Sequence, residues 1–278
     1  MAEPALSSGE PQSWRVIVDP LLQLEQRARG ATGLLACGDP SLPAGGIFVD
    51  DSRICWIAAR GLKRRLTDIL SHEIHLSDGE LRGLYDRCRL EGRPIGQALV
   101  GMGMISESHL RRVLRQHSAE SLVQLAHEGS GWHWLPRAHR GYDPQFTFSP
   151  DELLLEIAGL WHGTAQADAR AELEKFRGPG QHGGAFLRDP SESVYLPLAV
   201  YSDEKSLTLN DLMALGAWAT QLSAATMQLG ESPTVVLGNT VDGKGAAVWW
   251  RDGIVFAVRC RDREALARLM TRHLALGA

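Results

Sequence analysis

GRPIGQALVGMGMISESHLRRVLRQH, residues 92–117, carries the strongest structural signal in this chain. Apolar residues recur at helical spacing on both sides of the glycines at 101–103, so the stretch predicts two helices joined by a tight turn. Its second half bears three basic side chains, Arg111, Arg112 and Arg115. Two interpretations follow: a helix-turn-helix that binds DNA, or helices that pack inside a protein-binding module.

Capping signals extend this helical region in both directions. Ser77 and Glu80 form a capping box, and Gly92 ends the helix that they start. Asp19 and Pro20 are typical of a helix start near the N-terminus. Helices are therefore expected at about 19–30, 62–72, 77–92, 94–103 and 106–128.

Short apolar runs surround these helices and predict strands. Asp50-Asp51-Ser52 separates two of the runs and is typical of a hairpin turn. A second capping box at 149–152, with Pro150 in the first helical position, starts a further helix. The expected strands are at 33–37, 47–49, 54–58, 132–135 and 145–148. The N-terminal half is thus predicted to combine short strands with a helical insert.

The C-terminal half has a different order of predicted helices and strands. Asp242-Gly243 and Asp252-Gly253 are hairpin turns between apolar runs. Helices are expected at about 164–176, 208–229 and 262–276, and strands at 184–188, 194–200, 234–240, 246–250 and 254–260. This order, α-β-β-α-β-β-β-α, predicts an antiparallel sheet with flanking helices. The fold class is therefore α+β, with a disordered tail at 1–13 and domains at 14–162 and 163–278.

Composition and charge favour a cytoplasmic protein. The 278 residues are enough for two cores, and the net charge of −4 is spread evenly over the halves. The N-terminus lacks the basic and apolar regions of a signal peptide, and no apolar run approaches the length of a membrane span. The four cysteines form no CxxC pair and are expected to stay reduced.

No motif predicts catalysis, a metal or a cofactor. His72 and His75 lie three residues apart without a third ligand nearby. The chain contains no GxSxG nucleophile motif, and its glycine-rich stretches match neither GxGxxG nor a Walker lysine loop. We therefore expect a protein that is not an enzyme, with no cofactor and no metal site.

Charge balance decides between the two interpretations of the opening stretch. Residues 77–128 contain seven arginines and seven acidic residues. Binding to phosphates favours a net positive face, because released counterions supply much of the affinity. The balance therefore favours protein contacts. A DNA-binding regulator that uses 94–117 as a helix-turn-helix stays the second hypothesis.

Three motifs in the N-terminal half resemble the PATAN domain family over about residues 30–160. GGIFVDDSRICWIAARG (45–61) resembles the family's hairpin, and IGQALVGMGMISESHL (95–110) is similar to its helical insert. GSGWHWLP (129–136), followed by FTFSPDELLLEIAG (146–159), resembles its closing strand and helix. The stretch 38–45 departs from the family, in which a tighter turn is common. PATAN domains occur in bacterial signalling proteins and are regarded as interaction modules.

The order of elements at about 163–278 resembles the Roadblock (dynein light chain) family. Its members are cytoplasmic regulators, many of them dimers, and bacterial relatives act with Ras-like GTPases in motility and polarity. Neither family has a catalytic motif to carry over. The two resemblances together imply a non-enzymatic bacterial signalling adaptor or scaffold, with a Ras-like small GTPase or a response regulator as its protein partner and without nucleic acid or membrane.

The helix at 208–229 is the expected dimerisation element. It carries no charge from Leu212 to Gly230, whereas a helix on one face of a sheet needs a single apolar stripe. We expect self-pairing into a homodimer, with burial under the N-terminal domain as the alternative. The candidate interface residues are Leu212, Leu215, Gly216, Ala219, Leu222 and Ser223 of this helix, with Arg111, Arg112 and Arg115 in the N-terminal half.

Overall fold

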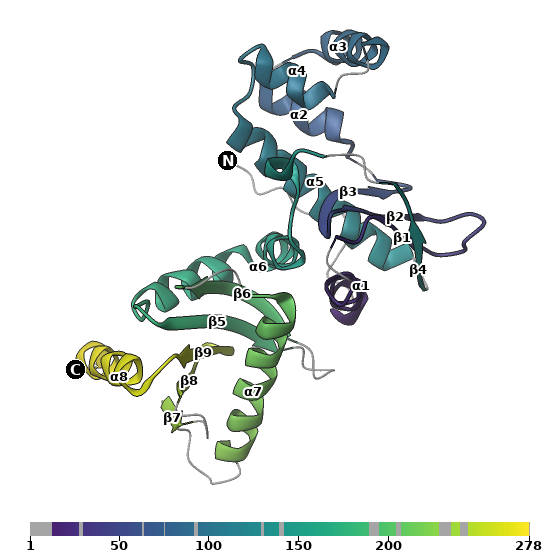
Figure 1. Cartoon of the computed structure of the whole chain (residues 1–278). Helices are drawn as coiled ribbons and strands as arrows, with labels where there is room; N and C mark the ends of the chain where they lie inside the picture. The colour runs from purple at the N-terminus through teal and green to yellow at the C-terminus, as the bar shows by residue number, and fades with distance from the viewer. Residues whose placement is uncertain are drawn as a thin grey trace. The chain divides into compact units, whose positions relative to one another are not determined.

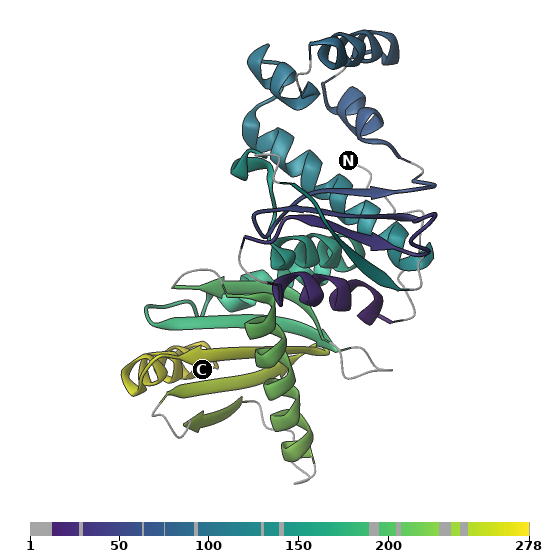
Figure 2. The same ribbon diagram turned by 45° about the vertical axis from the view of Figure 1, so that its right-hand side comes forward.

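The fold consists of two compact units. The computed structural model describes residues 13–27, 30–62, 64–74, 76–91, 94–128, 131–138, 142–188, 195–203, 207–227, 235–239 and 244–277. One unit is Arg27–Glu156, and the other groups Met1–Gln26 with Ile157–Ala278. Each contains an antiparallel sheet and helices (Figures 1 and 2). The predicted α+β class is confirmed.

The sheet of the Arg27–Glu156 unit has four antiparallel strands in the order β3-β2-β1-β4. Asp51 and Ser52 form the predicted hairpin turn, with φ of 50° and 63°. The strands are β1 (Gly33–Cys37), β2 (Gly45–Asp50), β3 (Arg53–Ala59) and β4 (Trp132–Pro136). Of the strand predicted at 145–148, only an isolated antiparallel bridge between Phe148 and Ile54 forms. The Asp143 carboxylate accepts the Gln145 N–H and caps a 3-10 turn, η1 (Pro144–Phe146).

The described residues between β3 and β4 form four helices. The Ser77–Glu80 capping box is present: the Ser77 N–H donates to the Glu80 carboxylate at 3.0 Å and the Glu80 N–H donates to Ser77 Oγ at 3.4 Å. Ser106 Oγ caps the last helix by accepting the His109 N–H. The helices are α2 (Leu66–Ile74), α3 (Asp78–Leu90), α4 (Ile95–Gly101) and α5 (Glu107–Glu128).

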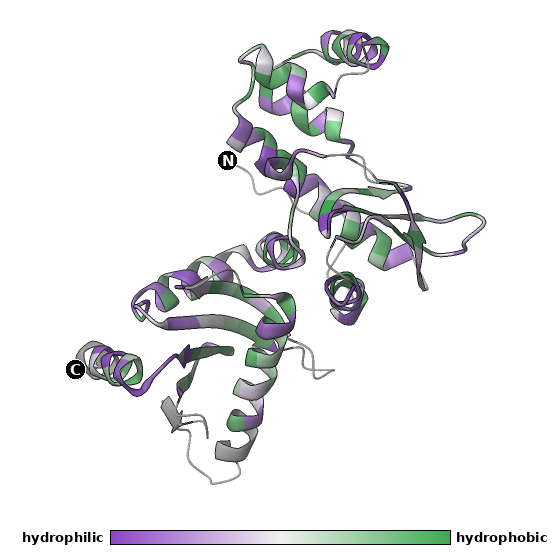
Figure 3. Cartoon of the chain, in the orientation of Figure 1, coloured by the Kyte–Doolittle hydropathy of each residue, from purple (hydrophilic) through white to green (hydrophobic). Residues whose placement is uncertain are grey.

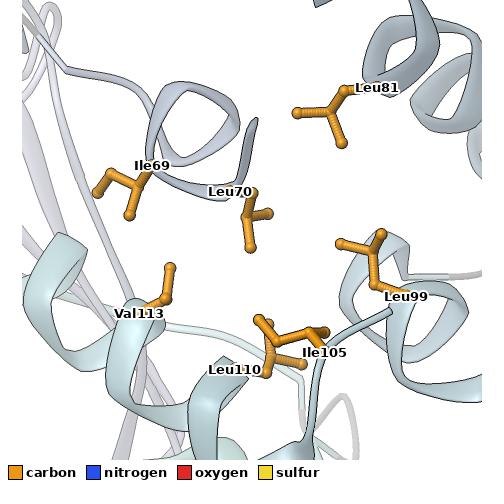
Figure 4. Packing of buried hydrophobic residues seen from close by; sticks show 7 residues of the cluster. All are labelled: Ile69, Leu70, Leu81, Leu99, Ile105, Leu110 and Val113. Atoms are coloured by element: carbon orange, nitrogen blue, oxygen red, sulfur yellow. The ribbon is translucent and has the colours of Figure 1, made fainter. Parts of the chain in front are cut away.

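The opening stretch packs these helices against one another. Gly103 adopts φ of 69°, which ends α4 and lets the chain return toward α5. The side chains that meet between the helices (Figure 4) are Ile69, Leu70, Leu81, Leu99, Ile105, Leu110 and Val113. Met102 and Met104, which the apolar pattern would also place in the core, are 52% and 37% exposed because they lie at the turn itself.

Helix α5 also meets the sheet through an aromatic pair. The rings of His117 and Trp56 on β3 stack at 4.7 Å with an interplanar angle of 21°. His117 is only 4% exposed, and its Nδ1 has no hydrogen-bond partner in the described part of the chain. Burial lowers the pKa of His117 to about 4, so the ring is neutral at pH 7.

The second unit has a five-stranded antiparallel sheet in the order β6-β5-β9-β8-β7. Its strands are β5 (Gln181–Arg188), β6 (Tyr195–Ser202), β7 (Val235–Asn239), β8 (Gly245–Arg251) and β9 (Ile254–Cys260). Its helices are α1 (Arg15–Glu25), the C-terminal part of α6 (Pro150–Glu174), α7 (Leu209–Met227) and α8 (Arg263–Gly277). Side chains alternate along each strand, so Val248 faces α7 while Trp249 stacks on Phe256 on the other face, where α8 lies (Figures 1 and 2).

The division between the units differs from the predicted domains at 14–162 and 163–278. The units divide between Glu156 and Ile157, within α6, whereas the predicted boundary falls at His162, where a non-helical φ of −129° separates two helical segments of α6. Helix α1 belongs with the C-terminal residues because the Glu25 carboxylate accepts the backbone N–H groups of Leu209 and Asn210, at 2.6 and 2.7 Å, where α7 begins. The tail predicted at 1–13 falls almost entirely outside the described residues.

The start predicted for α1 is wrong. The helix begins at Arg15, and Pro20 lies inside it instead of in its first turn. Proline in a helix interior removes one backbone hydrogen bond, so sequence rules disfavour it there. The buried stripe on α1, which includes Ile17, Leu21 and Leu24, favours the earlier start in spite of that loss.

Replacing Glu25 with alanine is expected to weaken the start of α7. Two backbone N–H groups lose their charged acceptor, which costs about 1–2 kcal/mol. Hydrogen exchange of the Leu209 and Asn210 amides should accelerate by about tenfold or more. Gln26→Ala, an exposed change at the next position, is the matched control. Unchanged exchange in Glu25→Ala would show that α1 does not hold α7.

The buried His117 should make the Arg27–Glu156 unit sensitive to acid. Its folded-state pKa, about 4, lies below the unfolded value of about 6.5. The unfolded chain therefore binds the extra proton, and stability falls as the pH drops below 6.5. Between pH 6.5 and 4.5 the free energy of unfolding should fall by about 2 kcal/mol more in the natural protein than in His117→Phe. Urea unfolding at both pH values measures the difference, and equal losses would contradict the buried neutral state.

Candidate functional site

The three predicted arginines lie in ion pairs within their own unit. Arg111 donates to the Glu152 carboxylate at 2.8 Å and to the backbone carbonyls of Gln145 and Thr147. Its guanidinium also lies 5.0 Å from the centre of the Phe148 ring. This side chain therefore ties α5 to the segment that leads into α6.

Arg115 and Arg112 are neutralised in the same way. Arg115 Nε donates to Glu156 at 2.7 Å, and Arg112 lies 3.2 Å from Glu73. Glu73 also pairs with His109 at 2.6 Å. The face of α5 that a DNA-reading helix would present is thus occupied by carboxylates of the same unit.

Glu152 joins several of these contacts. Burial by itself opposes its ionisation, but hydrogen bonds from the Ser149 N–H and from Arg111 outweigh that effect and lower the pKa of Glu152. Arg53 adds a second cation at 3.5 Å. The sequence reasoning did not single out Glu152 or Glu156 as partners. The equal numbers of acids and arginines at 77–128 were a signal of charge balance, but these two glutamates lie beyond that segment.

The α7 residues predicted to form an interface face the protein's own sheet. Leu212 and Ala219 are fully buried, and Leu215 is 8% exposed. Leu215 and Ala219 belong to a cluster with Phe186 of β5 and residues of β8 and β9. A Cβ on Gly216 would lie 3.1 Å from the Phe186 ring, so glycine allows the helix to approach the sheet closely.

These positions therefore supply the core of the unit, and a pairing surface on α7 must use its other side. Leu222 is partly buried against the same cluster. The side chain of Ser223 lies outside the described residues. The prediction placed the pairing surface on the sheet-facing side because hydropathy shows that a residue is apolar without showing which side of the helix meets the core.

The other side of α7 is accessible. Ala214 and Gln221 are exposed, and Ala217 and Trp218 are half-buried. Figure 3 shows mostly apolar and neutral colours along the described part of the helix. Beside it lies a hollow of about 300 Å³, bounded by Ala214, Leu215 and Trp218 of α7 and by His182, Ala246 and Arg259 of the sheet. This side of α7 is the candidate functional surface.

A metal centre is not found among the described residues. Within them, no three His, Cys, Asp or Glu side chains come together as metal ligands, and His75 lies outside them. The four cysteines are free thiols, and burial raises the pKa of Cys260 to about 11, which keeps it protonated. None of the helices in the described part of the chain is sufficiently long and apolar to span a bilayer.

Arginine at position 219 should destabilise the second unit rather than split a dimer. Ala219 is fully buried, so a longer, charged side chain costs at least about 3 kcal/mol through overpacking and desolvation. Gln221→Arg, two positions away on the exposed side, should change stability by less than about 0.5 kcal/mol. Thermal unfolding of both variants distinguishes the two sides of α7. Equal melting temperatures would contradict the assignment of position 219 to the core.

Comparison with models of known protein families yields no match for this chain, and a search of curated proteins finds none that resembles it significantly. The PATAN and Roadblock resemblances therefore stay predictions, and the function is argued from the site alone.

Proposed function

We propose that the chain is a non-enzymatic bacterial signalling adaptor that acts through protein–protein contacts. Its N-terminal unit is PATAN-like and its C-terminal unit is Roadblock-like, with pairing of two copies through α7. The partner class implied by these resemblances is a Ras-like small GTPase or a response regulator in the cytoplasm. The observation that carries the proposal is the accessible side of α7.

Helix α7 offers what a pairing surface requires. No charged residue occurs from Leu212 to Gly230, so two copies could approach without burying an unpaired charge. Ala214 is small and exposed, which allows close approach of a second helix, and the half-buried Trp218 supplies an aromatic side chain of the kind enriched at interface centres. The exposed side therefore combines shape and chemistry suited to a protein partner.

The order of elements supports the two family assignments. In the N-terminal unit, a helical segment lies between the third and fourth strands of one antiparallel sheet. In the second unit, α6 is followed by two strands, α7, three strands and α8. Both orders agree with the features on which the resemblances rest.

The DNA-binding alternative finds no supporting observation. Arg111, Arg112 and Arg115 each pair with a glutamate, so the segment 94–117 presents no set of free cations on α5. A protein that neutralises phosphates would lose affinity steeply with salt.

Light scattering on the full chain tests the pairing. The natural protein should give about twice the monomer mass of 30.4 kDa. Ala214→Arg should shift it to the monomer because two buried cations would face each other across the pair. Ala267→Arg, an exposed change on α8, is the matched control and should stay dimeric. A monomeric natural protein at about 100 μM, far above the Kd of a stable pair, would contradict pairing.

Fluorescence anisotropy with duplex DNA tests the alternative. We expect no saturable binding at about 150 mM salt, where a phosphate-binding face of several cations would still retain the duplex. Tight binding that is lost on changing Arg111, Arg112 and Arg115 to alanine would favour the DNA-binding regulator instead.

A further inference from the structure

A groove of about 830 Å³ lies in the Arg27–Glu156 unit, between β3, α2, α3 and the start of α4. Its position follows from the helix packing: α5 packs on β3, α2 packs on α5, and α3 packs on α2 and α4, which leaves a groove beside these contacts. Its walls are largely apolar and aromatic, formed by Trp56, Leu66, Leu70, Leu81, Tyr85 and Ile95. The volume lies in the range of known ligand sites.

The groove is exposed rather than sealed. Tyr85, which lines it, is 46% exposed, although a tyrosine ring is large enough to pack inside a core. A groove that leaves an aromatic ring this accessible exposes apolar surface that a binding partner would remove from water. Its occupant therefore has to cover an open surface lined by β3, α2, α3 and the start of α4, which suits a chain segment better than a compact small molecule.

The charges at the groove are not neutralised. Arg65 and Arg82 both line it, are exposed, and form no ion pair with any residue that the structure describes. Asp68 is the acidic residue among the lining side chains, and its carboxylate accepts the backbone N–H of Arg65 at 2.7 Å at the start of α2. With two arginines and one aspartate, the lining keeps a net positive charge. His117 lines the floor and is neutral at pH 7.

This differs from the arrangement on the exposed face of α5. There each of the three arginines has a glutamate within 3.2 Å. Arg87 and Arg89 on α3 also have no ion pair among the described residues, but they do not line the groove. Arg65 and Arg82 are the unpaired arginines at its apolar walls, where an external anion can pair with them. Arginine forms bidentate hydrogen bonds with carboxylates, which makes acidic side chains the complementary chemistry.

We propose that this groove binds an acidic peptide segment of a partner protein. A large apolar side chain of the segment packs against Trp56 and Tyr85, and its carboxylates pair with Arg65 and Arg82. The inference rests on the proposed adaptor function and names the chemistry of the partner. It does not require α7 to pair, because the groove belongs entirely to the other unit.

Selection from a random twelve-residue peptide library on the immobilised full chain tests this chemistry, because such a library favours no particular partner. We expect enrichment of sequences in which Asp or Glu flanks a large apolar residue. Against the double variant Arg65→Glu, Arg82→Glu, the acidic enrichment should disappear. Lack of enrichment on the natural protein, or the same enrichment on both proteins, would overturn the proposal.

Affinity measurements with one selected peptide then locate the site. Its Kd, read by fluorescence anisotropy, should rise roughly tenfold in Arg65→Ala, Arg82→Ala, because two charge-assisted pairs are lost. Arg87→Ala, Arg89→Ala is the matched control: both arginines are exposed on α3 but do not line the groove, and the Kd should stay unchanged. Equal weakening by both double variants would show attraction by general charge and would overturn the assignment.

Tyr85→Ala measures the contribution of the apolar contact to peptide binding separately from that of the arginine charges. The residue is too exposed to support the core, so the variant should fold with an unchanged melting temperature while the Kd rises. Dodecanoate is added as a competitor in the same assay, since a fatty acid shares the carboxylate and apolar chemistry. Saturable dodecanoate binding in the absence of any enriched peptide would overturn the peptide assignment in favour of a small amphiphile.

The outcomes are distinguishable from those of the proposed pairing. Light scattering reports on α7, whereas the peptide assay reports on Arg65, Arg82 and Tyr85. A dimer that binds no acidic peptide would overturn the groove proposal and leave pairing intact. A monomer that binds such peptides would overturn the proposed pairing and leave the groove proposal intact.

Discussion

The return of the chain at Gly103 is the constraint on which the N-terminal unit depends. Its φ of 69° lets α4 stop after seven residues and brings Ile105 into the same cluster as Leu99 and Leu110. Once α5 is held there, its length carries it across to the sheet, where His117 stacks on Trp56. The ion pairs, the buried imidazole and the open groove all follow from that one placement of α5.

The ion pairs on α5 contribute little to stability, and their main effect is to remove positive charge from the surface. Each lies at partial exposure, and pairs of that kind contribute about 0–1 kcal/mol. Their larger effect is to cancel the field of Arg111 and Arg115, which would otherwise attract phosphates. Arg65 and Arg82 keep their charge at the apolar groove, so two cations lie beside a surface to which a hydrophobic partner could also bind. Charge and hydrophobicity coincide at the groove, and this coincidence favours a peptide over a nucleic acid.

Local signals in the sequence were sufficient to predict most helices and strands. They were insufficient to predict which side of each helix is buried. The Ser77–Glu80 box and the Asp51–Ser52 turn act over three or four residues, so they could be predicted without knowing the fold. The membership of α1 in the second unit could not be predicted in this way, because the interaction that assigns it there joins Glu25 to Leu209, far along the chain. The burial of Ala219 was missed for a related reason: a helix that is apolar on every side does not reveal which side meets the sheet.

Helix α7 needs more than one cover because apolar side chains occur all round it. The sheet covers the side with Leu212, Leu215 and Ala219. Helix α1 contacts the first residues of α7, where the Glu25 carboxylate accepts the backbone N–H groups of Leu209 and Asn210. This contact is part of the intramolecular cover that competes with pairing, but Ala214 and Gln221 stay exposed beyond it. The remaining surface is uncharged and follows one helical side, so a second copy of the same helix can match it without any compensating charge. An acidic peptide would find no cation to pair with on this uncharged surface of α7. The pairing of two copies is therefore assigned to α7, and the binding of an acidic peptide to the groove of the other unit.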